Sequence, residues 1–292
     1  MAMVWAALLL SGIVCTSSQY IYSKDRCASN GETMMQIREL VIQQGRIQES
    51  VDSLRRMVKK LEEDVNKTHE DVRIVKKESH KYKDCKDLYV NGNTESGVYE
   101  IYPFGIESKV SVFCDMMTEG GGWTALQKRV SGSVSFDRTW SDYKTGFGHP
   151  SGSYWIGNDV IHQLTKRSNT SLYVTLTLTN GTKLYELYSQ FSVADETNKY
   201  RLFLGGPATG TLGDSMTSGH DLSGMPFTTK DRDNDRSINN CAVHNRGGWW
   251  FNSCHHAFLN GPWSSNSWDW LWYRTVMYGT SVKGTTMMVK RH

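Results

Sequence analysis

A heptad repeat of apolar residues runs from Ile37 to Val75 and constrains the fold of this chain more than any other feature. Apolar residues recur at alternating steps of three and four, and no proline interrupts them. The a positions are Ile37, Val51, Val58, Val65 and Val72, and the d positions are Leu40, Ile47, Leu54, Leu61 and Val75, with Gln44 (a) and Thr68 (d) as the polar exceptions. So narrow an apolar seam indicates a coiled coil rather than an amphipathic helix on a globular core. We expect residues 37–79 to form a helix that assembles homo-oligomers.

The number of strands in this coiled coil stays open. Valine at a with leucine at d favours two strands, but Ile37 and Ile47 weaken that preference. A buried Gln44 would cost stability and fix the register of the helices.

The N-terminus carries an apolar run from Met3 to Cys15, followed by small polar residues. This run is too short to span a bilayer, so we expect residues 1–18 to be a signal peptide and the protein to be secreted. No later stretch approaches the length of a membrane span. The formal net charge is only +3, with no sign of nucleic-acid binding. The basic run Lys76, Lys77, Lys81 and Lys83 fits a solvated junction, with a heparin-type patch as the alternative.

One loop of the C-terminal half carries acidic residues at alternate positions, Asp231, Asp233 and Asp235. Calcium takes about six to eight oxygen ligands, which alternate side chains and backbone carbonyls can supply. An EF-hand is excluded, because its glycine and glutamate positions are here Arg236 and Ala242. The loop therefore fits a calcium site of another type, and the alternative is a solvated acidic turn.

After Lys83 the composition shifts to tryptophan, tyrosine, glycine and short β-rich runs, over about 210 residues that suffice for one sizeable core. Residues 172–178 alternate as a half-buried strand does, residues 185–193 have strand-like composition, and residues 159–164 fit a short helix. The three glycines at 120–122 suit a tight turn. We expect an α+β domain with long loops in its last third.

Enzymatic activity is not expected, because the sequence contains no H-E-x-x-H, G-x-S-x-G or phosphate-loop motif. His255 and His256 are adjacent and would point to opposite faces of a strand, which makes them a poor zinc pair. Three N-x-S/T sequons, at Asn66, Asn169 and Asn180, predict solvent-facing glycosylation sites.

Ordered motifs along the chain resemble the fibrinogen-type C-terminal globular domain. They are D-C-K-D-L from Asp84, S-G-V-Y-E-I from Ser96, F-C-D-M-M-T-E-G-G-G-W-T from Phe113, Y-W-I-G-N-D from Tyr154, then D-R-D-N-D, N-N-C-A, G-G-W-W-F-N-S-C-H and L-N-G between Asp231 and Gly261. The resemblance implies that residues 80–292 form one such domain, with mixed antiparallel sheets and a loop-rich subdomain for calcium and ligand.

The resemblance implies the disulfides Cys85–Cys114 and Cys241–Cys254, as expected in an oxidising compartment. Cys27 is then left over, in the segment 19–36 before the coiled coil. We expect it to form an interchain disulfide, and the alternative is a free or capped thiol.

The resemblance also implies the calcium ligands. They would be the carboxylates of Asp233 and Asp235 and the backbone carbonyls of Ser237 and Asn239, with Asp231 peripheral. Calcium would neutralise the clustered carboxylates and order the loop beside a ligand pocket.

In acetyl-binding relatives the bond that matches Cys254–His255 is a cis peptide beside the pocket. The candidate pocket residues here are Cys254, His255, His256, Asn260, Trp263, Trp268 and Trp270. Trp249 and Trp250 are expected in the core. Relatives place a longer insertion, with a histidine and a tyrosine for the pocket, where only eleven residues, 262–272, follow Gly261 here. Those two pocket residues have no clear counterpart.

These features predict a secreted multimer whose stalk presents several calcium-stabilised heads. The expected function is that of an innate-immune lectin for microbial or host glycans, including acetylated ones, with avidity supplied by the stalk. The alternative is an angiopoietin- or fibrinogen-like ligand that acts on a protein receptor or in clot and matrix association, and a third option is a purely structural extracellular module.

Overall fold

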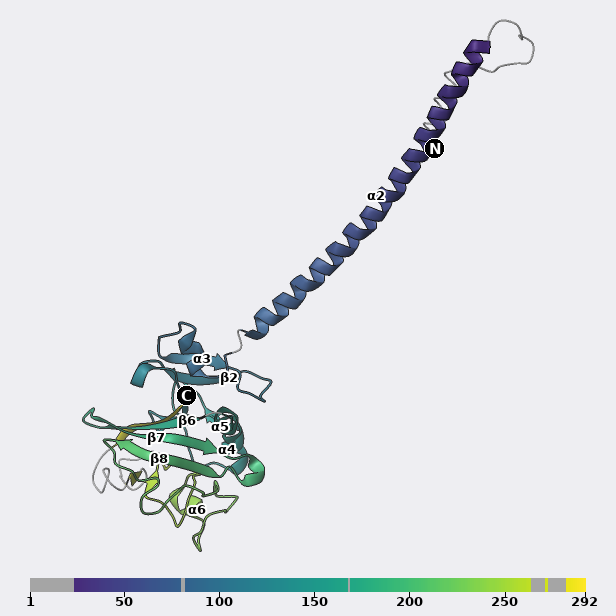
Figure 1. The fold of residues 1–292 in the computed structure, drawn as a ribbon. Helices are drawn as coiled ribbons and strands as arrows, with labels where there is room; N and C mark the ends of the chain where they lie inside the picture. The colour runs from purple at the N-terminus through teal and green to yellow at the C-terminus, as the bar shows by residue number, and fades with distance from the viewer. Residues whose placement is uncertain (1–23, 80–81, 168, 264–270, 273–281) are drawn as a thin grey trace. The chain divides into compact units, whose positions relative to one another are not determined.

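The computed structural model of the protein describes residues 24–79, 82–167, 169–263, 271–272 and 282–292. The chain divides into two units, Met1–Lys76 and Lys77–His292. The first holds one long helix and the second holds the sheet and the short helices (Figure 1).

The long helix α2 spans Lys24–Ser79. It ends where the heptad pattern predicts but begins earlier, so Cys27 lies within it, although the Cys27 side chain is outside the described residues. Seam side chains are exposed, with Leu40 63% exposed, Leu61 62% and Val65 63%. A continuous apolar seam in contact with water is what partner helices would bury, as the predicted coiled coil requires. None of the helices in the described ranges has the length and hydropathy that crossing a membrane takes.

The globular unit is built on one antiparallel sheet, which in the described residues has the order β1-β2-β3-β11-β6-β7-β8, with β4 and β5 attached to β3. The strands are β1 (Gly97–Ile101), β2 (Val110–Asp115), β3 (Trp123–Arg129), β4 (Phe147–Gly148), β5 (Tyr154–Trp155), β6 (Thr170–Leu178), β7 (Lys183–Val193), β8 (Leu202–Gly210) and β11 (Val282–Arg291). A separate pair consists of β9 (Ala257–Phe258) and β10 (Leu271–Trp272). The expected α+β class with an antiparallel sheet is confirmed.

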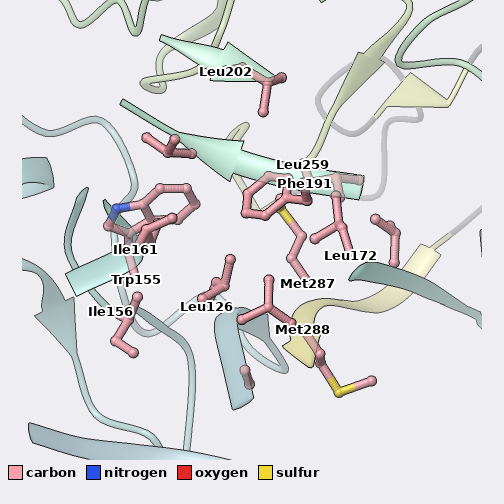
Figure 2. Packing of buried hydrophobic residues seen from close by; sticks show 14 of the residues in the cluster. Leu126, Trp155, Ile156, Ile161, Leu172, Phe191, Leu202, Leu259, Met287 and Met288 are labelled. Atoms are coloured by element: carbon pink, nitrogen blue, oxygen red, sulfur yellow. The ribbon is translucent and has the colours of Figure 1, made fainter. Parts of the chain in front are cut away.

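Strand β11 lies in the middle of the sheet and joins its two parts, because this last strand pairs with both β3 and β6. Its residues Met287 and Met288 are buried between side chains from β3, β6 and β7, including Leu126, Leu172 and Phe191 (Figure 2). The C-terminal strand therefore completes the core. Each Å² of apolar surface that it buries stabilises the fold by about 25 cal/mol.

The globular unit also contains the short helices α3 (Cys85–Val90), α4 (Trp140–Thr145), α5 (Asn158–Thr165) and α6 (Cys241–Asn245), with the 3-10 turns η1 (Thr118–Gly120) and η2 (Glu196–Asn198). The disulfide Cys85–Cys114 joins α3 to β2, with its Cα atoms 5.5 Å apart. Arg291 at the end of β11 pairs with Asp84, which caps α3, at 2.5 Å. The two ends of the globular unit are thus fastened together.

The local predictions for residues 159–164, 172–178 and 185–193 are confirmed as α5, β6 and β7. The glycine turn is confirmed too, since Gly121 has φ of 71° and a Cβ there would lie 2.5 Å from the Met116 carbonyl oxygen. Trp249 and Trp250 are fully buried, as expected.

Candidate calcium and ligand site

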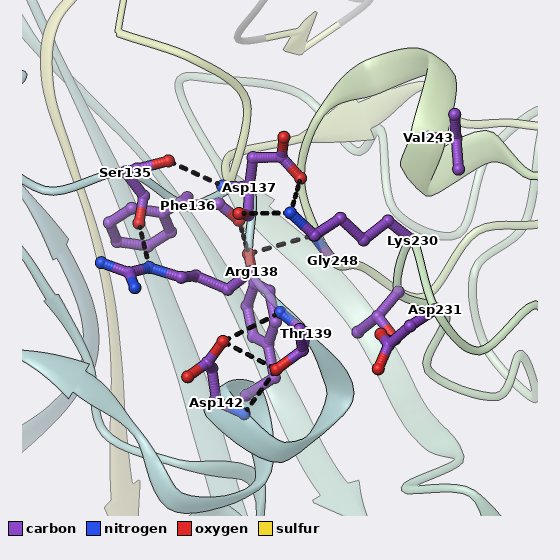
Figure 3. Close-up of polar contacts among 12 residues, drawn as sticks. Ser135, Phe136, Asp137, Arg138, Thr139, Asp142, Lys230, Asp231, Val243 and Gly248 are labelled. Atoms are coloured by element: carbon purple, nitrogen blue, oxygen red, sulfur yellow. Dashed lines mark hydrogen bonds and ion pairs between the residues drawn. The ribbon is translucent and has the colours of Figure 1, made fainter.

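The acidic loop follows β8 and a long irregular segment. Its entry is anchored by Asp231, whose Oδ1 accepts hydrogen bonds from the Trp140 amide at 2.9 Å and from the Thr229 hydroxyl at 2.7 Å. Lys230 pairs with Asp137 at 3.1 Å (Figure 3). The Asp231 carboxylate thereby holds the loop against α4.

The two acids predicted to bind calcium are coupled to each other. The Asp235 amide donates to Asp233 Oδ1 at 3.2 Å, and the Asp235 carboxylate accepts from the amides of Ser237 and Cys241, each at 2.9 Å. Burial raises the pKa of the Asp235 carboxyl, with a further contribution from the negative charge of Asp233. A cation bound here would relieve both the desolvation of Asp235 and its repulsion by Asp233.

The donor types around these acids fit a hard cation. The backbone carbonyl oxygens of Ser237 and Asn239 accept no hydrogen bond from any residue that the structure describes, so they remain free for a ligand role. The described residues contain no cluster of three or more His, Cys, Asp or Glu side chains suited to a metal. A cation in this loop would therefore depend on carboxylates and carbonyls together, which suits calcium better than zinc.

The disulfide Cys241–Cys254 joins the acidic loop to the segment with the histidines, as predicted, with an S–S distance of 2.05 Å. A backbone hydrogen bond from Arg236 to the Asn252 carbonyl, at 2.9 Å, ties the same two segments a second time. The cis peptide bond lies between Ser253 and Cys254. This is one residue before Cys254–His255, the bond that the resemblance matches to the cis peptide of acetyl-binding relatives and whose own isomer the sequence left open.

His255 is held by aromatic packing. Its ring stacks on Phe258 at 4.9 Å and lies 5.6 Å from Phe251, while Nε2 is 3.2 Å from Asn245 Oδ1. Nδ1 is buried and has no hydrogen-bond partner in the described part of the chain. Burial lowers the pKa of His255 to about 3, helped by the neighbouring histidines, so the ring is neutral at physiological pH.

His256 points to a different neighbour, the segment before the acidic loop. The His220 amide donates to His256 Nδ1 at 3.3 Å, and the two rings meet edge to face at 4.5 Å. Gly219, with φ of 78°, passes so close that a Cβ there would lie 2.0 Å from Nδ1. Sequence reasoning missed His220 and Gly219, because a lone Gly-His pair in a Gly- and Ser-rich loop carries no spacing signal.

The remaining predicted pocket residues are distributed unevenly. Asn260 is fully buried. Its Oδ1 accepts a hydrogen bond from Gln127 Nε2 at 3.1 Å and its Nδ2 donates to the Gly248 carbonyl at 3.0 Å, so it is a buried structural residue and not part of the surface. Trp263 is 36% exposed and packs over Gly132. Cys254 is half-buried within its disulfide. Trp268 and Trp270 lie outside the described residues.

The three sequon asparagines are exposed, as glycosylation requires: Asn66 lies on α2, Asn169 just before β6 and Asn180 in the turn between β6 and β7.

Comparisons with known proteins agree with this architecture. The family model "Fibrinogen beta and gamma chains, C-terminal globular domain" matches residues 81–292. Angiopoietin-2 of Canis lupus familiaris is 38% identical over 255 residues, which cover 85% of this chain and 50% of the relative. Ryncolin-4 of Cerberus rynchops is 45% identical over 179 residues, which cover 61% of this chain and 51% of the relative. The chain thus spans about half the length of these two relatives.

Among solved structures, the fibrinogen-like globe domain of human ANGPTL6 is similar with a TM-score of 0.67 and 38% identity, over 72% of this chain and 96% of that one. The chain therefore belongs to the family of the C-terminal globular domains of fibrinogen beta and gamma chains.

Proposed function

We propose that the protein is a secreted multimeric lectin that binds microbial or host glycans, including acetylated ones, at a calcium-dependent site on each head. Calcium would be held by the carboxylates of Asp233 and Asp235 and by the carbonyls of Ser237 and Asn239. The ion would supply positive charge that removes the repulsion between the two acids.

The observation that carries the proposal is that two bonds link the acidic loop to the segment that contains His255 and His256. They are the Cys241–Cys254 disulfide and the hydrogen bond from the Arg236 amide to the Asn252 carbonyl. Because of these links, ordering of the acidic loop would also order the backbone beside His255. Beside that backbone the neutral His255 ring packs against the aromatic rings of Phe251 and Phe258, an environment that suits an uncharged sugar substituent.

Multivalency gives the stalk its role. A single glycan site with weak affinity becomes useful when several heads engage one surface, and the exposed seam of α2 is suited to bringing heads together. Cys27, before the seam, would lock the oligomer by an interchain disulfide.

The test is binding of the full-length multimer to a glycan array and to acetylated resin, with calcium and with EDTA. We expect binding that needs calcium, is competed by an N-acetylated monosaccharide and is lost in Asp233→Ala. The matched control is Glu107→Ala, which removes an exposed acid outside the loop. A folded, calcium-loaded protein that binds no glycan on the array would contradict the lectin proposal.

A protein receptor is the second candidate. It is favoured by the similarity to angiopoietin-2 over 85% of the chain, which extends beyond the globular domain into α2. The short segment after Gly261 points the same way, because it leaves the acetyl pocket of relatives incomplete. Capture of a cell-surface protein by the multimer, unaffected by monosaccharide, would identify this function.

A further inference from the structure

Two hollows of the globular unit share a wall and carry the same charge. The first has a volume of about 630 Å³ and lies among α5, β7 and β8. The second, of about 360 Å³, lies between η2 and the acidic loop. Arg201 lines both hollows, and its Nη1 donates to the Gly224 carbonyl at 2.5 Å, which holds the guanidinium in place.

The lining is strongly basic. The cations of the first hollow are Lys166, Arg167 and Arg201, with His162 beside them, and those of the second are Lys199, Arg201 and Arg236. Neither set of lining residues includes an aspartate or a glutamate. We call this pair of hollows the basic groove.

These cations differ from others on the same unit. Lys144, Lys230, Arg232 and Arg291 each have a carboxylate within 4.0 Å. Among the residues that the structure describes, none of the five lysines and arginines of the basic groove has such a partner. The nearby Asp195 carboxylate accepts hydrogen bonds from the Thr197 hydroxyl and the Asn198 amide. The groove therefore has a surplus of positive charge that the protein does not neutralise.

We propose that the basic groove binds a sulfated polysaccharide, at a site separate from the proposed calcium-dependent one. Arginine and lysine bind sulfate oxygens through charge-assisted hydrogen bonds, and an extended chain with repeated sulfates can follow both hollows past Arg201. Nucleic acid is disfavoured, because Phe203, 52% exposed, is the one exposed aromatic ring among the described lining residues, and single strands need several stacking platforms.

The predicted glycosylation site Asn169 also lines the first hollow. A glycan there would stand over the groove, so all proteins for the test carry Asn169→Gln. The test variant is Lys166→Ser/Arg167→Ser/Arg201→Ser. The matched control, Lys76→Ser/Lys77→Ser/Lys81→Ser, removes the same number of positive charges from the basic run at the junction of the two units.

Binding of the full-length protein to a heparin dodecasaccharide is measured at several salt concentrations. We expect the groove variant to bind about tenfold more weakly and the slope of log K against log salt to fall by about 2, as for loss of three ion contacts with a flexible polyanion. The control should keep its affinity within about twofold. Unchanged melting of both variants excludes misfolding as the cause.

Equal losses in both variants, or a loss in the control alone, would overturn the proposal. So would equal binding of desulfated heparin, which would mean that sulfate is not recognised. An oligonucleotide of equal charge, or phosphatidylserine vesicles, bound as tightly as heparin would also contradict the assignment to sulfated saccharide.

Discussion

Asp233 and Asp235 are predicted to contribute equally to calcium binding but unequally to the stability of the calcium-free protein. Asp235 accepts two backbone hydrogen bonds, from Ser237 and Cys241, whereas Asp233 accepts one, from the Asp235 amide. A hydrogen bond to a charged group contributes about 1.5–3 kcal/mol, and relief of burial and repulsion offsets part of this loss at Asp235. We therefore expect Asp235→Ala to cost about 2 kcal/mol in EDTA. Asp233→Ala should cost less than about 1 kcal/mol, because its side chain is exposed and solvent weakens its one hydrogen bond.

Thermal unfolding of the full chain in EDTA and in calcium measures both effects. For a domain of this size 1 kcal/mol corresponds to about 2–4 °C, so Asp235→Ala should lower the EDTA midpoint by about 4–8 °C. Calcium at a hundred times its Kd should raise the wild-type midpoint by about 5–10 °C, and neither variant should respond. Equal EDTA midpoints for the two variants, or a retained calcium shift in Asp233→Ala, would refute this account of the loop.

Three further predictions concern the frame around the loop. Folding lowers the pKa of His255 from its ordinary value to about 3, so the neutral ring stabilises the fold fully above about pH 6.5 and this stabilisation declines as pH falls toward 3. Wild-type protein should therefore lose about 2 kcal/mol of unfolding free energy from this group between pH 7.5 and 5. Urea titrations at the two pH values should show that His255→Phe does not have this loss. Gly219→Ala should destabilise by more than about 1 kcal/mol, because its Cβ would strike His256, whereas Gly224→Ala, at similar φ but in open space, shows the backbone cost alone. Replacing Cys241 and Cys254 by serine should cost about 3 kcal/mol and weaken calcium binding, as calorimetry would show.

Local sequence patterns predicted the elements that depend on neighbouring residues. The alternation at 172–178 became β6, and the heptads became α2 with an exposed seam. The place of β11 between β3 and β6 had no such signal, because the order of strands in a sheet follows from tertiary packing. The early start of α2 at Lys24 was missed because residues before Ile37 lack the heptad pattern.

Residue chemistry singled out the acidic loop, and the family resemblance implied the Cys241–Cys254 disulfide. The structure brings the two together, because the Cys241 amide donates to the Asp235 carboxylate. Asn260 was expected at the ligand surface, but its amide satisfies the buried Gln127 and Gly248, a role that no sequence motif distinguishes from ligand contact. His220 approaches His256 from a loop distant in sequence, so only the structure brings them together.

The central claim is that the acidic loop controls ligand binding through calcium. The most direct measurement titrates calcium against both the thermal midpoint and the binding of the multimer to an N-acetylated glycan surface. The account predicts that the two curves share one calcium midpoint and that Asp233→Ala abolishes both. Glycan binding at full strength in EDTA, while the thermal midpoint still responds to calcium, would contradict it.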